Sequence, residues 1–353
     1  MTKKILLRIV ALLMSVALFT GCGSVSESSR SQKDDKQEKI QIGMCFDSFV
    51  IERWQRDRDV FVSTAKELGA EVNIQNANGD VEQQKTQIEY FIKKGMDVIV
   101  IISIDAEALV DSVKKAKDAG IYVIAYDRPI PNAEADLYIS FDNEKVGQLM
   151  GEALIQAGLN GGKAVMIGGS LKDQNVPMVM SGFKNVIRQG NNVILDEYYC
   201  DGWKAELASE YVYDNFDKIE QADAIMCGND DLASKVVFAL SEKRLAGKKL
   251  VVGQDADLEA CQRIVEGTQL MTVYKPIEKL AQKAAEAAVH LAKGDAIEDA
   301  GLAEYDDGSA TIPYLKIEPV SVTKDNIDDV IINSGFHLKE DVYLNVPSKM
   351  PGN

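Results

Sequence analysis

The sequence of 353 residues is poor in the side chains on which most catalytic and metal sites depend. It has two histidines, His290 and His337, and neither lies in a motif with metal-ligand spacing. The run Gly168-Gly169-Ser170 lacks the glycine that follows the serine of a nucleophile elbow, and there is no Walker loop. Asp255-Ala256-Asp257 begins like a calcium loop but lacks the central glycine and the later acids. We therefore expect a protein without cofactor or metal that is not an enzyme. The competing interpretation is a glycosidase, because paired carboxylates also suit that class of enzyme.

Positive charge is also scarce, with 39 lysines and arginines against 55 acids and a formal net charge of −16. No lysine- or arginine-rich run is available to neutralise a phosphate backbone. The composition therefore excludes nucleic acid as a partner.

Cysteine is infrequent, and its five positions follow no metal-binding spacing. Cys45 and Cys227 lie inside apolar, strand-like runs. We expect the four cysteines after Cys22 to be buried free thiols rather than disulfides; they are Cys45, Cys200, Cys227 and Cys261.

A long apolar stretch occurs at the N-terminus and nowhere else. Lys3, Lys4 and Arg8 open the chain, and the stretch ends in Phe19-Thr20-Gly21-Cys22. This order is typical of a bacterial lipoprotein signal, although the usual motif has leucine where this chain has phenylalanine. A transmembrane anchor is the alternative, but the apolar run is short and ends in Gly-Cys. We predict a signal peptide over 1–21, lipidation of Cys22, a polar tether over 22–38 and an extracytoplasmic, membrane-anchored protein.

After the tether, strand-like and helix-like segments alternate along the chain. Continuous apolar runs such as 98–102 and 250–252 are typical of parallel strands that are covered on both faces. The alternation predicts an α/β protein with doubly wound parallel sheets.

The chain has a faint internal repeat, in which residues 97–127 are similar to residues 223–255. In both passages a strand that begins after an acid is followed by a helix and a second strand that ends in Asp127 or Asp255. Because ligands of open α/β sheets bind at the carboxyl ends of strands, two facing lobes would bring these carboxylates to one cleft. The alternative is that any two βαβ units look alike.

The two tryptophans, Trp54 and Trp203, lie in polar stretches just after strand-like runs. An aromatic ring flanked by hydrogen-bonding groups suits a sugar, whose C–H groups lie on the ring while polar side chains bind the hydroxyls. Two half-buried surface tryptophans are the alternative interpretation.

Several segments resemble periplasmic D-xylose-binding proteins, in order and without large gaps, between Lys39 and Leu338. The longest match is Gly267-Thr268-Gln269-Leu270-Met271-Thr272-Val273-Tyr274-Lys275-Pro276, and the others are 42–44, 52–59, 125–128, 138–147, 201–203 and 253–258. The resemblance implies a type I periplasmic-binding-protein fold: two Rossmann-like lobes, a hinge of three crossovers and a ligand in the cleft. It also implies a monomeric binder that delivers a neutral aldose, D-xylose before glucose, to an ABC transporter permease.

By position, the resemblance implies nine sugar contacts: Arg53, Trp54, Asp127, Arg128, Asn175, Trp203, Asn229, Asp255 and Lys275. Asp173 is a weaker candidate, because 173–176 departs from the Asp-Asn-Asn-Ala that the family often shows.

Some polar residues near these positions have structural interpretations. We expect Asp230 and Asn143 to cap helices, and residues 56–59 to form a solvated helix face. The pair Asp127–Arg128 could be a structural ion pair, but its place after a strand, repeated by Asp255, favours ligand binding.

The lobes are expected at 39–142 with 276–312 and at 143–275 with 313–340, followed by a tail over 341–353. Repressors share this fold, but they carry a DNA-reading helix pair where this chain has a signal and a tether. A sensor that presents its sugar-bound state to a membrane histidine kinase remains open as an alternative to the transporter role.

Overall fold

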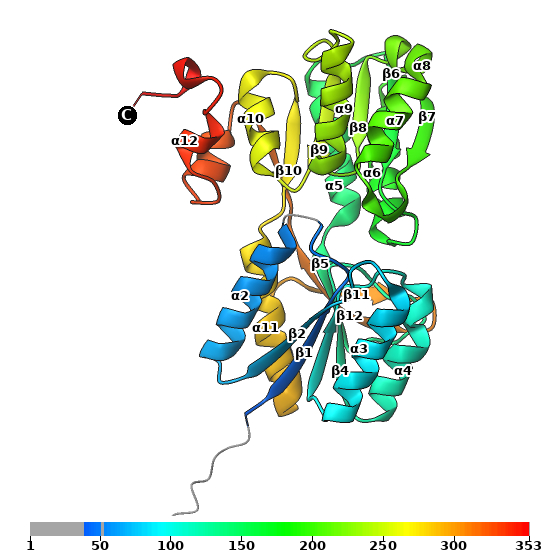
Figure 1. The fold of residues 1–353 in the computed structure, drawn as a ribbon, viewed down its shortest axis with the longest axis vertical. Coiled ribbons are helices and arrows are strands. Elements are labelled where there is room, and N and C mark those ends of the chain that lie inside the picture. Colours follow the sequence, from blue (N-terminus) through cyan, green and yellow to red (C-terminus); the bar gives the residue numbers. More distant parts are fainter. Residues whose placement is uncertain (1–38, 51–52, 353) are drawn as a thin grey trace, which may run out of the picture. The chain divides into compact units, whose positions relative to one another are not determined.

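The computed structural model describes residues 39–50 and 53–352. The predicted signal peptide, Cys22 and the tether lie outside the described residues. The described chain forms two lobes, each a largely parallel sheet with helices on both faces (Figure 1). None of the described helices is long and apolar enough to cross a membrane.

The N-terminal lobe is built on a seven-stranded sheet in the order β11-β12-β5-β4-β3-β1-β2. Neighbouring strands are parallel except for the antiparallel hairpin β11–β12 at one edge. Its strands are β1 (Gln41–Phe46), β2 (Glu71–Asn76), β3 (Val98–Ile101), β4 (Tyr122–Tyr126), β5 (Leu137–Phe141), β11 (Leu302–Asp306) and β12 (Thr311–Ile317).

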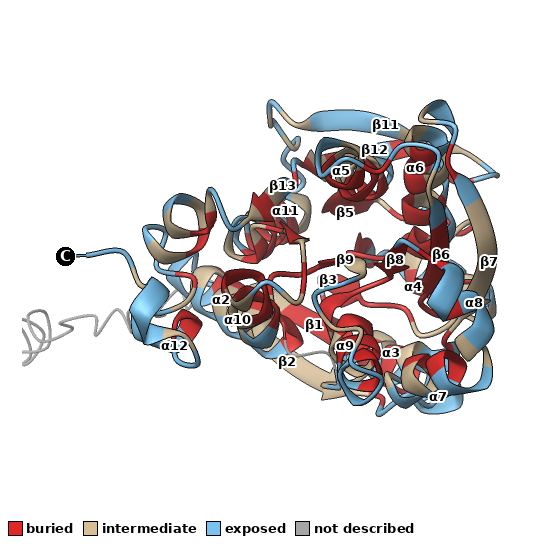
Figure 2. Cartoon of the chain, turned by 90° about the horizontal axis from the view of Figure 1, so that it is seen from above, coloured by how far each residue is buried: buried red, intermediate tan, exposed pale blue. Residues whose placement is uncertain are grey.

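Helices α2 (Arg53–Glu67) and α11 (Ile277–Lys293) cover one face of this sheet, and α3 (Val81–Lys94) and α4 (Val110–Asp118, preceded by the short η1, Glu107–Leu109) cover the other (Figure 1). Successive strand residues point to opposite faces, so the residues of β3 are shared alternately between two apolar clusters. This double burial is the physical reason for the continuous apolar runs in the sequence. Figure 2 shows the buried residues along the strands and on the inner faces of the helices.

The C-terminal lobe is built on a six-stranded sheet in the order β13-β10-β9-β8-β6-β7, in which β13 runs antiparallel to β10. Its strands are β6 (Lys163–Gly168), β7 (Val193–Tyr199), β8 (Ala224–Cys227), β9 (Leu250–Gln254), β10 (Met271–Tyr274) and β13 (Val320–Thr323). Its helices are α5 (Asn143–Gln156), α6 (Asn175–Gln189), α7 (Glu206–Asp214), α8 (Phe216–Gln221), α9 (Asp230–Glu242) and α10 (Leu258–Glu266).

The internal repeat predicted from the sequence is present in both sheets. The order β2-β1-β3-β4-β5 in one lobe corresponds to β7-β6-β8-β9-β10 in the other. The acids that open the two passages also have the same contacts: Asp97 Oδ2 accepts from Gln41 N at 2.7 Å, and Asp223 Oδ2 accepts from Lys163 N at 2.8 Å. The matched passages therefore reflect equivalent places in two similar lobes.

The chain passes between the lobes three times: after β5, after β10 and between β12 and β13. The third crossing lies later than expected, because β12 pairs with β5 and keeps 313–317 in the N-terminal sheet. The residues expected as a tail also have structure. Helix α12 (Lys339–Val342) packs on α10, and η3 (Asp328–Ile332) and η4 (Pro347–Lys349) flank it. The residues expected as a tail are in contact with α10 through Asp341, Asn345 and Lys349.

Candidate functional site

A cavity of about 490 Å³, its opening included, lies where the carboxyl ends of strands from both sheets meet. Segments of both lobes line it, as expected for a ligand at the carboxyl ends of parallel strands. All nine predicted contact residues are among the residues that line it: Arg53, Trp54, Asp127, Arg128, Asn175, Trp203, Asn229, Asp255 and Lys275. Their role in binding a sugar remains a prediction.

Two buried aspartates occupy similar positions in the two lobes. Asp127 follows β4, and its N–H donates to the carbonyl of Ile139 on β5 at 2.7 Å. Asp255 follows β9, and its N–H donates to the carbonyl of Val273 on β10 at 2.9 Å. Both have positive φ, 65° and 98°, a conformation that is costly for residues other than glycine and is concentrated at functional sites.

Arg53 connects these carboxylates across the cleft. Its Nη2 donates to Asp127 Oδ2 at 2.7 Å, and its Nη1 lies 3.9 Å from Asp255 Oδ1. Lys275 Nζ lies 3.1 Å from the same Asp255 oxygen. Burial by itself would raise the pKa of Asp127, but the charges of Arg53, Lys275 and Arg128 lower it below its ordinary value. Asp127 is therefore an ionised acceptor at neutral pH.

Asp57 lies behind Arg53 and contradicts the expectation of a solvated helix face. It is fully buried, four residues after Arg53 on α2, and accepts from Arg53 and from the hydroxyl of Tyr126. Burial raises the pKa of Asp57, and the opposing charge of Arg53 does not cancel that effect. The alternation of acids and bases over 56–59 looked like a surface pattern. Asp57, however, lies one helical turn after the buried Arg53, so its side chain is on the same buried face of α2.

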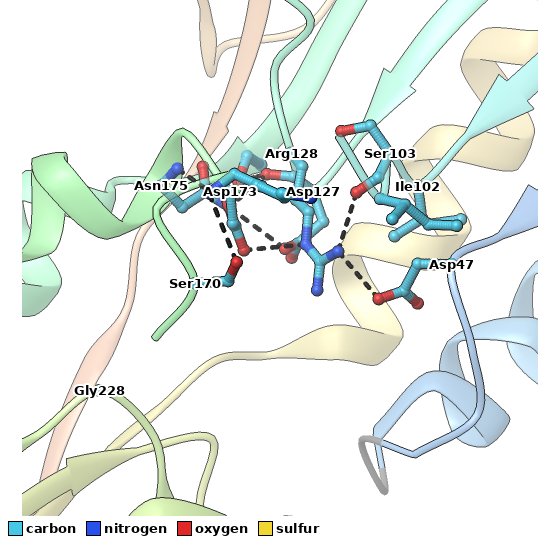
Figure 3. A network of polar contacts seen from close by, with 12 residues as sticks. Asp47, Ile102, Ser103, Asp127, Arg128, Ser170, Asp173, Asn175 and Gly228 are labelled. Carbon is cyan, nitrogen blue, oxygen red and sulfur yellow. Dashed lines mark hydrogen bonds and ion pairs between the residues drawn. The ribbon is translucent and has the colours of Figure 1, made fainter. Parts of the chain in front are cut away.

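Arg128 holds one carboxylate from each lobe (Figure 3). Its Nη1 donates to Asp47 Oδ2 at 2.9 Å and to the Ser103 carbonyl at 2.8 Å, both in the N-terminal lobe. Its Nε forms an ion pair of 2.9 Å with Asp173 Oδ2 in the C-terminal lobe. Asp173, the weaker candidate from sequence, is thus a lobe-to-lobe partner of Arg128 as well as a residue of the cavity wall.

Asn175 makes a second connection between the lobes. Its Nδ2 donates to the Asp127 carbonyl at 2.9 Å, and its Oδ1 accepts from Asn143 Nδ2 at 2.9 Å. Tyr138 also donates to Asn175 Oδ1, at 3.2 Å. These bonds fix the amide at the start of α6 against the loop that carries Asp127.

Trp203 is held in the short η2 (Asp201–Trp203), where it has φ 58° and follows a glycine that also has positive φ. Its six-membered ring lies against the backbone of Gly169: a Cβ at Gly169 would lie 2.3 Å from ring atoms. Glycine is required there by this close approach. The strained backbone and the packed ring fix the tryptophan at the cavity wall.

Trp54 is almost fully buried at the start of α2 and belongs to the apolar core of the lobe. The Cζ of Arg53 lies 4.4 Å from its ring centroid, and the Cζ of Arg128 lies 5.7 Å from it. The ring therefore also supports the two arginines through cation–π contacts. The alternative interpretation of a half-buried surface tryptophan is therefore wrong for Trp54.

Several polar atoms in the cavity wall have no hydrogen-bond partner among the described residues. They include two donors, Trp54 Nε1 and Trp203 Nε1, and two acceptors, Gln254 Oε1 and Asp255 Oδ1. Buried polar atoms without partners are rare in folded proteins, and here they surround a space that a ligand could fill. Gln254 was not among the contacts predicted from the sequence, although it lies in the segment 253–258 that carries part of the family resemblance.

Two predicted helix caps are corrected. The side chain that caps α9 is Asn229, which accepts from Leu232 N at 3.0 Å, and Asp230 is instead fully buried in a polar network. Helix α5 is capped by Asp142, which accepts from Lys145 N at 3.0 Å. Asn143 points into the site and lines the cavity.

The four described cysteines are buried and form no disulfide with one another, as predicted. In the described part of the chain, no group of three or more histidine, cysteine, aspartate or glutamate side chains could hold a metal ion.

Comparison with known proteins identifies the fold and the family. A family described as "Periplasmic binding protein domain" matches residues 42–296. The chain is 42% identical to the D-xylose-binding periplasmic protein of Haemophilus influenzae over 328 residues, 92% of this chain and 96% of that protein. It is also 42% identical to the D-xylose-binding periplasmic protein of Escherichia coli over 313 residues, 86% of this chain and 93% of that protein.

A solved structure with a similar fold is an ABC transporter solute binding protein from Clostridium phytofermentans with bound β-D-glucose. It has 27% sequence identity and a TM-score of 0.77, and the match covers 86% of this chain and 99% of that one. The chain therefore belongs to the periplasmic binding protein family, a family of extracytoplasmic solute binders rather than enzymes, as its resemblance to the D-xylose-binding proteins predicted.

Proposed function

We propose that this protein binds a neutral aldose, D-xylose in preference to other aldoses, in the cavity between its lobes. The two D-xylose-binding relatives support the choice of sugar, and the glucose-bound structure supports a pyranose in a site of this kind. The nine predicted contact residues are the proposed sugar-binding residues, and Asn143, Asp173 and Gln254 join them in the cavity wall.

The observation that carries this proposal is the set of buried donors and acceptors without hydrogen-bond partners among the described residues, in a wall of balanced charge. Three cations and three carboxylates line the cavity: Arg53, Arg128, Lys275, Asp127, Asp173 and Asp255. A sugar hydroxyl both donates and accepts, so it can satisfy indole N–H groups and carboxylate oxygens in one site. A phosphate or a carboxylate ligand would need an excess of cations, which this wall lacks.

The apolar part of the wall supports the same ligand class. Trp203 and the aliphatic side chains of Val176, Val179, Met180 and Met226 add apolar surface to the cavity wall. Pyranose rings expose C–H groups that pack on such surfaces while their hydroxyls reach the polar side.

The mechanism that we propose is closure of the lobes around the sugar. The polar residues of the cavity come from both lobes, so a sugar in the cavity gains its full set of contacts when the lobes are together. A ligand that binds the closed form more tightly shifts the equilibrium towards it. Closure would then present the bound state of a monomer to its membrane partner.

We further propose that Cys22 is lipidated, that the tether holds the protein at the outer face of the cell membrane, and that the sugar is delivered to an ABC permease. The sequence from Lys3 to Cys22 supports the anchor. The description of the similar C. phytofermentans protein as an ABC transporter solute binding protein supports the role in transport.

Thermal denaturation with a panel of small molecules tests the ligand class. A ligand that binds the native state raises the melting temperature, so D-xylose should raise it and D-glucose should raise it less. D-Xylose 5-phosphate and neutral amino acids should leave it unchanged. Stabilisation by the phosphate sugar, with none by any free aldose, would contradict the proposal.

A further inference from the structure

The loop that carries Asp255 has an unusual backbone for its sequence. Asp255 has φ 98° and Ala256 has φ 56°, so two consecutive residues with a Cβ lie in the left-handed region. Such a conformation persists when surrounding contacts fix it more strongly than the local preference opposes it. The contacts that fix this loop therefore determine where the Asp255 carboxylate points.

Two buried side chains supply these contacts from beneath the loop. The Thr272 hydroxyl, on β10, accepts from Ala256 N at 3.1 Å and donates to Asp230 Oδ2 at 2.6 Å. The same Asp230 oxygen accepts from Asp257 N at 3.3 Å. The backbone N–H groups of Ala256 and Asp257 thus donate to one buried pair, the Thr272 hydroxyl and the Asp230 carboxylate.

This pair is built into the lobe. Thr272 and Asp230 are both fully buried, and neither is among the residues that line the cavity. Asp230 Oδ1 accepts from Gln269 Nε2 at 2.8 Å, which holds the carboxylate from its other side. The neighbouring strand makes room for it with Gly253, where a Cβ would lie 2.3 Å from Asp230 Oδ1.

The position of the Asp255 carboxylate depends on this support of its backbone together with its ion pairs to Lys275 and Arg53. Its Oδ1 has no hydrogen-bond partner among the described residues, although it lies 3.1 Å from Lys275 Nζ. The backbone next to it is held by a further contact, from the Ala256 carbonyl to His337 Nε2 at 2.8 Å. A small rotation of the loop would move the carboxylate relative to any ligand.

We propose that Thr272 and Asp230 are positioning residues, which hold the Asp255 loop so that its carboxylate accepts from the sugar. This inference rests on the proposed sugar-binding function. Thr272→Val keeps the shape of the side chain but leaves Ala256 N without an acceptor and removes one donor to Asp230. It should weaken D-xylose binding by about tenfold, whereas Thr272→Ser, which keeps the hydroxyl, should bind like the wild type.

A double-mutant cycle separates positioning from general destabilisation. In an Asp255→Asn background, Thr272→Val should cost about threefold or less, because the carboxylate that it positions is already gone. Val252→Ala is the matched control: Val252 is buried on β9 in the apolar core, so this variant loses stability without touching the loop. Its affinity for D-xylose should remain that of the wild type. If Thr272→Val does not fold, Asp230→Asn takes its place with the same expectation.

Calorimetric titration of D-xylose into the full-length protein and these variants distinguishes the outcomes. Coupling between Thr272 and Asp255, with rescue by serine, would support the positioning role. Equal losses from Thr272→Val in both backgrounds, or wild-type affinity in folded Thr272→Val, would overturn it while the sugar-binding function stands. Failure of the wild type to bind any aldose would overturn both.

Discussion

Asp127 and Asp255 are held by the same backbone hydrogen bond in two different lobes. Each N–H donates to the carbonyl of a central residue of the next strand, Ile139 or Val273. Each carboxylate faces the same cavity, and the Arg53 guanidinium lies between them. The repeated βαβ unit thus contributes one acid from each lobe, and a single arginine of the N-terminal lobe connects them.

Arg53→Lys tests this connection. A lysine has one charged nitrogen and cannot reach Asp57, Asp127 and Asp255 together, so buried carboxylates lose a partner. We expect D-xylose affinity to fall at least about tenfold and the free energy of unfolding to fall by about 1–3 kcal/mol. Calorimetry and urea unfolding measure the two effects.

Arg58→Lys is the control for this substitution. Arg58 lies on the same helix and pairs with an exposed Asp59. Exposed pairs contribute little, so its stability and affinity should stay close to the wild type. If Arg53→Lys behaved like Arg58→Lys, Arg53 would not be the connection between the two acids.

The Arg128–Asp173 pair should favour the closed arrangement of the lobes. Asp173→Asn removes the negative charge that Arg128 contacts across the cleft, so the sugar-free protein should open more often and bind D-xylose more weakly. Small-angle X-ray scattering would show a larger radius of gyration without sugar. Lys172→Ala removes a solvent-exposed ion pair to Asp105 across the same cleft and should change neither quantity. Equal radii of gyration for the sugar-free wild type and Asp173→Asn would show that the Arg128–Asp173 pair does not favour the closed arrangement.

Much of this architecture could be predicted from the sequence because it depends on local patterns. Continuous apolar runs report strands that are buried on both faces, and the acid at the end of each repeated unit reports a strand end. Of the nine predicted contacts, the repeat itself placed Asp127 and Asp255, whereas the full set came from the resemblance to the D-xylose-binding proteins. All nine lie near strand ends or helix starts of the two lobes.

The errors share a different cause. Asp57, Asp230 and Asn143 were assigned from their place along a helix, but their environment is set by residues distant in sequence: Tyr126, Thr272 and Asn175. The third crossing was misplaced because the pairing of β12 with β5 joins residues about 175 apart in sequence. Such pairings are decided by tertiary packing and leave no trace in a local pattern.

Asp230 should make stability depend on pH. Burial raises the pKa of Asp230 from 3.8 to about 7, against the opposing effects of Arg263, Thr272 and Gln269. Between pH 3.8 and about 7, Asp230 therefore holds a proton in the folded state and is ionised in the unfolded state. The stability that this proton contributes is lost as the pH rises through about 7. From about pH 5 to pH 8, the free energy of unfolding of wild type relative to Asp230→Asn should fall. Parallel curves for the two proteins in urea titrations would contradict this.

The anchor can be tested in cells of a bacterium that processes lipoproteins. Cys22 should carry a lipid, and the protein should partition into the detergent phase. Cys22→Ala should release the protein from the membrane or stall its processing. Mass spectrometry that finds unmodified Cys22 in protein from the membrane fraction would contradict the lipoprotein assignment.

The central claim is that a sugar binds in the cavity that Trp203 and Asp255 help to line, and calorimetric titration of D-xylose into Trp203→Ala and Asp255→Ala tests it most directly. Loss of the ring should cost about 1–3 kcal/mol of binding free energy, or about ten- to a hundredfold in affinity. Asp255→Ala should be at least as severe, because it leaves the Lys275 charge without its carboxylate partner in a buried site and removes one of the three carboxylates around Arg53. Both variants should stay folded, which circular dichroism confirms independently. Wild-type affinity in both folded variants would place the sugar elsewhere and contradict the account.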